Sequence, residues 1–174
     1  ICFCSCAQHC ELIAASAPSQ AMHIGLIGGI GPKATSFYFQ RIVQLFGAAS
    51  KPLHLTIAHT DIGFLGKNMA SGDKLAQANE YKRVTDQLAA AGADRVAITS
   101  LGGSFCGDEF AKITPLPMMD GPLAVAAHLK TSGVIKVGLL GTKAVMSTRL
   151  YGKLDDVCET LTPIDDALEQ AHAD

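Results

Sequence analysis

The chain has 174 residues, of which 48% are hydrophobic, 17% charged and 6% aromatic, and its formal net charge is −2. This length fits one ordinary domain, or one domain and part of another, and the composition is typical of an α/β domain with an aliphatic interior. No run of Lys or Arg could neutralise a row of phosphates or attract an anionic membrane surface, and no apolar stretch is long enough to cross a bilayer. These features exclude nucleic acid and membranes as expected partners and predict a soluble protein.

The first 21 residues differ from the remainder of the chain. Four of the six cysteines fall among the first ten residues: Cys2, Cys4, Cys6 and Cys10. A closed zinc site draws its four ligands from separated segments, so this spacing argues against a metal site, although His9 could complete a ligand set on paper. The segment lacks the basic residues of a signal peptide, and Met22 stands directly before a strand pattern. Residues 1–21 are therefore interpreted as a non-native or disordered extension, and a cytoplasmic protein with reduced thiols is expected.

The apolar pattern predicts strands and helices in alternation. A buried strand over residues 23–29 ends in glycines, and Pro32 suits the first position of a helix that continues to about Phe46. Later segments are assigned as strands over 52–61, 95–101, 115–120 and 134–142, helices over about 73–91 and 122–130, and a polar glycine-containing loop over 62–72. Such alternation indicates an α/β fold with a parallel sheet flanked by helices, which binds ligands beyond the carboxyl ends of its strands.

The segment GLIGGIGPKAT, residues 25–35, lies at such a carboxyl end. Gly29, Gly31 and Ala34 match the G-x-G-x-x-A pattern of dinucleotide sites. The acid that should bind the ribose about 20 residues further on is missing, because Asp61 lies too far along the chain. Backbone N–H groups at the start of a helix could instead hold any small anion, including the carboxylate of an amino acid. A nucleotide-dependent enzyme and a non-catalytic small-acid binding domain both remain as alternatives.

Candidate reactive groups follow the third predicted strand. Cys106 lies in a glycine-rich loop on the ligand side of the sheet, where a thiol could act as an acid or base. A lone cysteine is equally well explained as a small buried hydrophobic residue. Thr99 and Ser100, at the tip of the strand, could hydrogen-bond a ligand, and capping or turn formation explains them nearly as well.

Four segments together resemble a known family. In chain order, IGLIGGIGPKAT, AGADRVAI, PLPMMDG and KVGLLGTKAVMSTRLY resemble the aspartate/glutamate racemases of the Asp/Glu/hydantoin racemase superfamily, over about residues 22–154. The resemblance implies two similar α/β domains with the active site between them. It also implies an isomerase that racemises an acidic amino acid without a cofactor or metal. Two thiols, one from each domain, stand on opposite faces of Cα, where one removes the proton and the other returns it.

The resemblance assigns candidate site residues in two ways. The family carries C-x-N-T-x-H after its third strand, and an ungapped match places Thr99 at the thiol, Leu101 at the Asn and Ser104 at the His. A shifted loop makes Cys106 the thiol instead, and both assignments stay open. Thr99 would be a far poorer base than a thiolate. The groups expected to grip the substrate carboxylates are Gly29, Pro32, Ser100 and Thr142.

The expected organisation has three parts. These are the extension (1–21), a racemase-like α/β domain (22–133) and the beginning of a second, incomplete α/β domain (134–174). The second thiol would lie beyond the end of this chain, so the chain is expected to be an inactive fragment, or nearly so. Apolar residues left without cover predict association, of which a homodimer is one form, or poor solubility; examples are Val137, Leu139 and Leu140. A related lyase or isomerase on the same fold is a further alternative.

Overall fold

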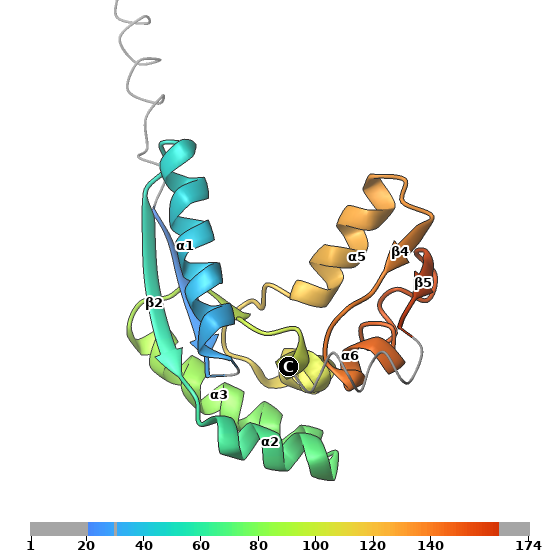
Figure 1. Cartoon of the computed structure of the whole chain (residues 1–174). Coiled ribbons are helices and arrows are strands. Elements are labelled where there is room, and N and C mark those ends of the chain that lie inside the picture. The colour runs from blue at the N-terminus through green and yellow to red at the C-terminus, as the bar shows by residue number, and fades with distance from the viewer. Residues whose placement is uncertain (1–20, 30, 164–174) are drawn as a thin grey trace, which may run out of the picture.

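The computed structural model of the chain describes residues 21–29 and 31–163 (Figure 1). The elements are β1 (Met22–Gly28), α1 (Pro32–Ala48), β2 (Leu53–His59), α2 (Ile62–Ser71), α3 (Lys74–Ala90), β3 (Arg95–Ile98), the 3-10 helix η1 (Gly102–Cys106), α4 (Gly107–Ile113), α5 (Gly121–Thr131), β4 (Lys136–Gly138), α6 (Lys143–Ser147) and β5 (Glu159–Leu161). The predicted α/β fold class is confirmed. The predicted extension, with its four cysteines and His9, lies outside the described residues apart from Ala21. No helix within the described ranges is both long and apolar enough to cross a membrane.

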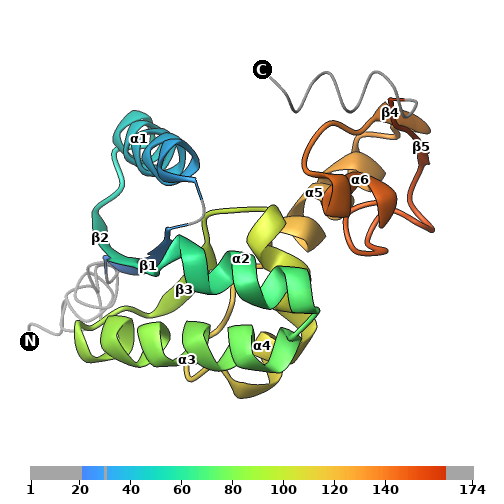
Figure 2. The same ribbon diagram turned by 60° about the horizontal axis from the view of Figure 1, so that its bottom comes forward.

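A parallel sheet in the order β2-β1-β3 forms the centre of the first part of the chain. Successive side chains of a strand point to opposite faces of the sheet. Gly25 and Gly28 of β1 are three residues apart and therefore face opposite sides, so their neighbours show what covers each face. A Cβ at Gly28 would meet Thr35 of α1, whereas a Cβ at Gly25 would meet Leu88 of α3. The sheet therefore has α1 on one face and α3 on the other. Figure 2 shows α2 beside α3, with α1 on the far side of β1 and β2.

The main hydrophobic core lies on the α3 face of the sheet. Tyr81 of α3 and Phe110 of α4 are both 0% exposed, and their rings meet edge to face with centroids 5.7 Å apart. The same cluster includes Ile27, Leu65, Val84, Leu88 and Val96. On the other face, every residue of α1 is at least partly exposed, and Phe37 is 67% exposed. The face that carries α3 thus supplies most of the packing.

The loop predicted for residues 62–72 is wrong, because most of this segment forms α2. The Asp61 Oδ1 atom accepts a hydrogen bond from the Phe64 N–H at 2.9 Å and caps the first turn. Leu65 is 2% exposed and packs into the main core. Gly63 and Gly66 lower the helix propensity of α2, but the free energy gained by burying its apolar face is larger.

The strand predicted for residues 115–120 is also wrong. Within the described part of the chain, Met118 makes an isolated bridge to β3 there and no strand forms. Pro115 and Pro117 lack the N–H groups that a strand ladder needs. The strand predicted for residues 134–142 shortens to β4, which pairs with β5 in a separate parallel sheet. Among the described residues, the central sheet therefore has three strands, in the order β2-β1-β3.

A second hydrophobic cluster joins α5 to the segments that follow it. Its buried members are Ala126, Val145, Leu150 and Leu154. Figure 1 shows that α5, α6, β4 and β5 lie together on the opposite side of the molecule from β1 and β2. Leu139 packs against this cluster, whereas Leu140 is 78% exposed. The three-part division of the chain and its association remain predictions.

Candidate functional site

The turn after β1 brings backbone from three elements into close contact. Gly29 is buried and has a φ of 122°, a region that glycine adopts far more readily than other residues. A Cβ at this position would overlap the carbonyl oxygen of Thr60, which follows β2. The Thr60 hydroxyl in turn donates to the Gly28 oxygen at 3.0 Å. Pro32 then opens α1, whose positive dipole end therefore lies at this turn.

Gly29→Ala tests this arrangement. The added Cβ combines a strained φ with an overlap against backbone, so we expect the free energy of unfolding to fall by at least about 2 kcal/mol. Gly66→Ala is the matched control, since a Cβ in that helical position meets no described atom within 4 Å. It should be neutral or stabilise by up to about 1 kcal/mol. Equal urea midpoints for the two variants would contradict the backbone conformation assigned to Gly29.

Thr99 reaches the same turn from the end of β3. It is 1% exposed, and both its N–H and its hydroxyl donate to the Ile27 oxygen, at 3.0 and 2.9 Å. Its Oγ1 also lies 2.8 Å from the Oγ1 of Thr35, near the start of α1. Because the Thr99 proton is directed to Ile27, Thr35 is the donor in this second bond. The hydroxyl is therefore fixed between the end of β1 and the start of α1.

Ser100 and Thr142 both lie near Gly102, the first residue of η1. A Cβ at Gly102 would lie 3.6 Å from the Ser100 Oγ and 3.7 Å from the Thr142 Cγ2. Both hydroxyls also have local roles. The Ser100 Oγ accepts from the Gly103 N–H at 3.2 Å, and the Thr142 Oγ1 caps α6 by accepting from the Val145 N–H at 3.4 Å. The structure thus places both predicted substrate ligands near Gly102, and each also stabilises its own turn.

Cys106, the other candidate for the acid–base role, is buried in the protein interior. It is 0% exposed and belongs to the main core, and its Sγ lies 4.0 Å from the Gly103 oxygen. Burial, with a smaller contribution from the nearby Glu109 carboxylate, raises the pKa of the Cys106 thiol to about 12. Such a thiol is neutral at pH 7, whereas proton abstraction requires the thiolate. The role of Cys106 remains a prediction that this geometry does not favour.

The raised pKa predicts how Cys106 reacts. In the native protein, iodoacetamide should modify Cys158, which is partly exposed, well before Cys106, as peptide mapping by mass spectrometry would show. The unfolded thiol ionises near pH 8.5 and the folded one near pH 12. The free energy of unfolding should therefore be unaffected below about pH 8 and then fall by up to about 1.4 kcal/mol per pH unit until the folded thiol ionises. Equal modification rates at the two cysteines would contradict the buried placement.

Two tyrosines hold η1 in place from different parts of the chain. The Tyr81 hydroxyl donates to the Gly103 oxygen at 3.1 Å, and the Tyr151 hydroxyl donates to the Gly102 oxygen at 2.8 Å. Tyr151 and the preceding Leu150 both have a φ of 58°, which costs roughly 1–2 kcal/mol for each residue that is not glycine. Burial of Leu150, which is 0% exposed, helps to fix this strained segment. The second cluster is thereby tied to the loop that follows β3.

Sequence reasoning missed the role of Thr35. The residue stands in the glycine-rich segment, and its place one turn after Pro32 is the signal that could have found it, since a side chain there faces the end of the neighbouring strand. Within residues 21–29 and 31–163, no group of three or more His, Cys, Asp or Glu side chains could hold a metal ion. The hydroxyls of Thr35, Thr60 and Thr99 are hydrogen-bonded at the turn.

Comparisons with solved structures show which proteins share this fold. A Yersinia pestis protein proposed to be an Asp/Glu racemase superimposes with a TM-score of 0.75 at 28% identity, covering 85% of this chain and 67% of that one. An aspartate racemase homologue from Pyrococcus horikoshii gives a TM-score of 0.74 at 24% identity, covering 87% and 68%. Picrophilus torridus aspartate racemase gives 0.69 at 20% identity, covering 87% and 66%. The chain therefore spans about two thirds of the length of these proteins.

A comparison with sequence families shows which family the chain belongs to. No curated protein matches the chain significantly. Residues 27–158 match the family described as Asp/Glu/Hydantoin racemase, which confirms the resemblance found in the sequence. The matched segment covers well over half of the chain and includes the end of β1, the glycine turn, β3 and η1. The chain belongs to the Asp/Glu/hydantoin racemase family.

Proposed function

We propose that the chain forms part of a cofactor-independent racemase that acts on an acidic amino acid of the aspartate or glutamate type, in the cytoplasm. The observation that carries this proposal is the convergence of β1, α1 and β3 on the Thr99 hydroxyl, which hydrogen-bonds Ile27 and Thr35. Family membership supports the reaction class. Racemisation at Cα requires removal and return of a proton of very high pKa, so the site must both hold the carboxylates and present an acid–base group.

The substrate carboxylates would be held by groups that are already in position. The N-terminal end of α1 attracts an anion through its dipole, and Gly29, with its φ of 122°, allows the backbone turn that leads into this helix. Ser100 and Thr142 would supply hydroxyls from the other side of the site. Donors fixed in this way stabilise the negative charge that develops on the α-carboxylate as the proton leaves Cα.

Thr99 is the proposed acid–base group of this part of the protein. Its oxygen accepts a hydrogen bond from Thr35 at 2.8 Å, which would stabilise negative charge on that oxygen. A hydroxyl remains a much weaker base than a thiolate, so proton removal should be slow. For Cys106 to take the role instead, its sulfur would have to leave the main core.

Inversion needs a second acid–base group on the opposite face of Cα. Of the two candidates among the described residues, Thr99 faces the turn and Cys106 faces the core. We therefore expect this chain alone to exchange the α-proton with solvent while the configuration is retained, and to be nearly inactive as a racemase.

Deuterium wash-in tests the proposal. The chain is incubated with L-aspartate, D-aspartate and the two glutamates in D₂O, and mass spectrometry and chiral chromatography follow the label and the configuration. Slow labelling at Cα with retention is expected for at least one of these amino acids. Absence of label in all four would contradict the proposed chemistry, and binding without label would favour a small-acid binding domain. Rapid inversion would contradict the single acid–base group.

A further inference from the structure

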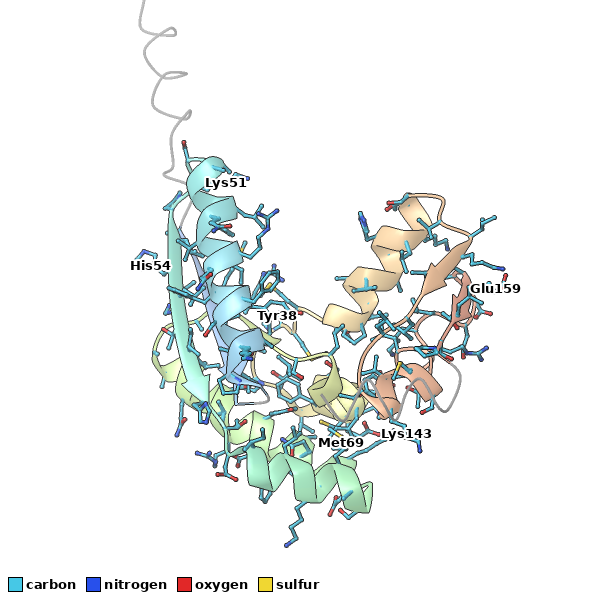
Figure 3. All side chains as sticks on the ribbon, in the orientation of Figure 1. Tyr38, Lys51, His54, Met69, Lys143 and Glu159 are labelled. Carbon is cyan, nitrogen blue, oxygen red and sulfur yellow. The ribbon has the colours of Figure 1, made fainter. Side chains whose placement is uncertain are left out.

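The strand β2 forms an edge of the central sheet that no described residue covers. Alternate residues of a strand in a parallel ladder bond to the same neighbour, and the Thr60 N–H donates to the Gly28 oxygen of β1 at 2.9 Å. By this alternation, the even-numbered residues of β2 direct their backbone groups to β1. The odd-numbered residues direct theirs outward, to no described partner, and these are Leu53, Leu55, Ile57 and His59. Figure 3 shows β2, where His54 is labelled, at the outer margin of the ribbon.

The other strand edges in the described part of the chain are protected against pairing with a further strand. β3 is covered on its outer side, because the Val96 N–H donates to the Pro117 oxygen at 3.1 Å and the Val96 oxygen accepts from the Met119 N–H at 2.7 Å. β4 and β5 have three residues each and begin with Lys136 and Glu159. Short strands and charged residues both oppose edge pairing. β2 has seven residues and contains no proline, lysine, arginine, aspartate or glutamate, so it is the described edge best suited to pairing.

The sequence of β2 is complementary to itself when two copies run antiparallel. A two-fold axis at Thr56 places outward-facing residues opposite one another, where each pair exchanges two N–H···O bonds. Leu55 then lies opposite Ile57 of the second copy and covers its side chain, which is 43% exposed in one chain. On the other face of the sheet, the Thr56 side chains of the two copies meet, and cross-strand threonine pairs are favourable. No two charged residues oppose each other in this register.

The helix α1 lies beside this edge, on the face of the sheet that carries Ile57. A Cβ at Gly28 would lie 3.0 Å from the Thr35 Cγ2 and 3.6 Å from the Ile57 Cγ2. α1 thus lies over β1 and β2 (Figure 2). Neighbouring strands are about 4.8 Å apart, so pairing through β2 would bring the α1 helices of two copies to within about 10 Å of each other, which is the spacing of packed helices.

One flank of α1 offers apolar side chains for this second contact. Figure 3 shows Tyr38 on the side of α1 that is turned towards α5, away from β2. Residues follow one another by about 100° around a helix, which places Phe39 and Val43, one turn apart, on the flank towards β2. Both are exposed in one chain. A stable interface buries about 800 Å² of each partner, so this flank would add the area that a single strand does not provide.

We propose that two copies of the chain associate through β2 in an antiparallel, two-fold symmetric pair. Their central sheets would join in the order β3-β1-β2-β2-β1-β3. Because β3 is covered on its outer side, pairing through the central sheet stops at two copies. This interface goes beyond the proposed racemase function. It also lies apart from Val137, Leu139 and Leu140, on which the sequence-based prediction of association rested.

Sedimentation of the full chain under reducing conditions tests the association. At about 50 µM the protein should have twice the mass of one chain. Ile57→Lys places a charge against Leu55 of the second copy, and Ile57→Pro removes an outward N–H without touching the ladder to β1. Each should raise the dissociation constant of the dimer at least about 100-fold. Leu75→Lys is the matched control, because Leu75 is 66% exposed on α3, and it should leave the dissociation constant unchanged.

Circular dichroism first establishes that each variant is folded. A monomeric parent protein would overturn the proposal, and so would an unchanged dissociation constant in folded Ile57→Lys and Ile57→Pro. In the dimer, the outward N–H groups of β2 should be protected from hydrogen exchange. Protection of the same groups in a monomer would show that another part of the chain covers this edge, which would overturn the proposal as well.

Thr56→Cys tests the register directly. At the two-fold axis the two copies of residue 56 form a pair whose Cβ atoms lie about 4.5 Å apart, close enough for a disulfide. Mild oxidation should therefore link residue 56 of one copy to residue 56 of the other, as peptide mapping by mass spectrometry would show. Ser71→Cys, at an exposed position on α2, is the matched control and should give no such symmetric link. Absence of the link in Thr56→Cys would overturn the antiparallel pairing.

Discussion

Thr99→Val should reduce proton exchange at Cα of the substrate by at least about 100-fold. Valine has nearly the shape of threonine, but it removes the oxygen that lies 2.8 Å from the Thr35 hydroxyl. The Ile27 oxygen keeps its bond from the residue 99 N–H, at 3.0 Å in the parent protein, so the turn should remain folded. Deuterium incorporation at Cα, measured by mass spectrometry, tests this prediction. Circular dichroism shows whether the variant is folded.

Cys106→Ala is the matched control for that experiment. Its sulfur lies in the main core, so the substitution should lower stability while it leaves the exchange rate within about threefold of the parent value. The opposite pair of results, in which Cys106→Ala loses exchange and Thr99→Val retains it, would assign the acid–base role to the thiol. It would also require a rearrangement of η1 that brings the sulfur out of the core.

Phe110→Ala should lower the free energy of unfolding by about 3–5 kcal/mol. The ring is 0% exposed and packs edge to face on Tyr81, whose hydroxyl holds η1. Since whole domains are stable by only about 5–15 kcal/mol, this loss could unfold the protein at 37 °C. Phe37→Ala is the control. Phe37 is 67% exposed, so this substitution should lower the free energy of unfolding by about 0.5 kcal/mol or less. Similar urea midpoints for the two variants would contradict the location of the core.

Local signals explain the parts of the fold that were predictable. The strand, glycine turn and helix around Gly29 and Pro32 follow from an apolar run, two glycines and a proline that lie together in sequence. The helix after Asp73 was found because that residue caps it, with its Oδ1 accepting from the Ala76 N–H at 2.9 Å. Each of these features needs only its immediate neighbours in the chain.

Features that depend on distant contacts could not be predicted. The helix α2 forms because Leu65 packs into the main core, although the glycines of α2 lower its helix propensity. The direction of the Cys106 sulfur depends on η1, which is held by Tyr81 and Tyr151 through bonds that span 22 and 49 residues. Thr99 was a candidate because it ends a strand, but its bond to Thr35 spans 64 residues and needed the assembled sheet.

The central claim is that the glycine turn holds a small acid beside the Thr99 hydroxyl. A crystal structure of the chain with L-aspartate tests this claim most directly. The α-carboxylate is predicted to lie at the N-terminal end of α1, with Cα about 3.5 Å from the Thr99 Oγ1. Aspartate bound elsewhere on the protein, with the Thr99 hydroxyl still directed to Ile27 and out of its reach, would contradict the account.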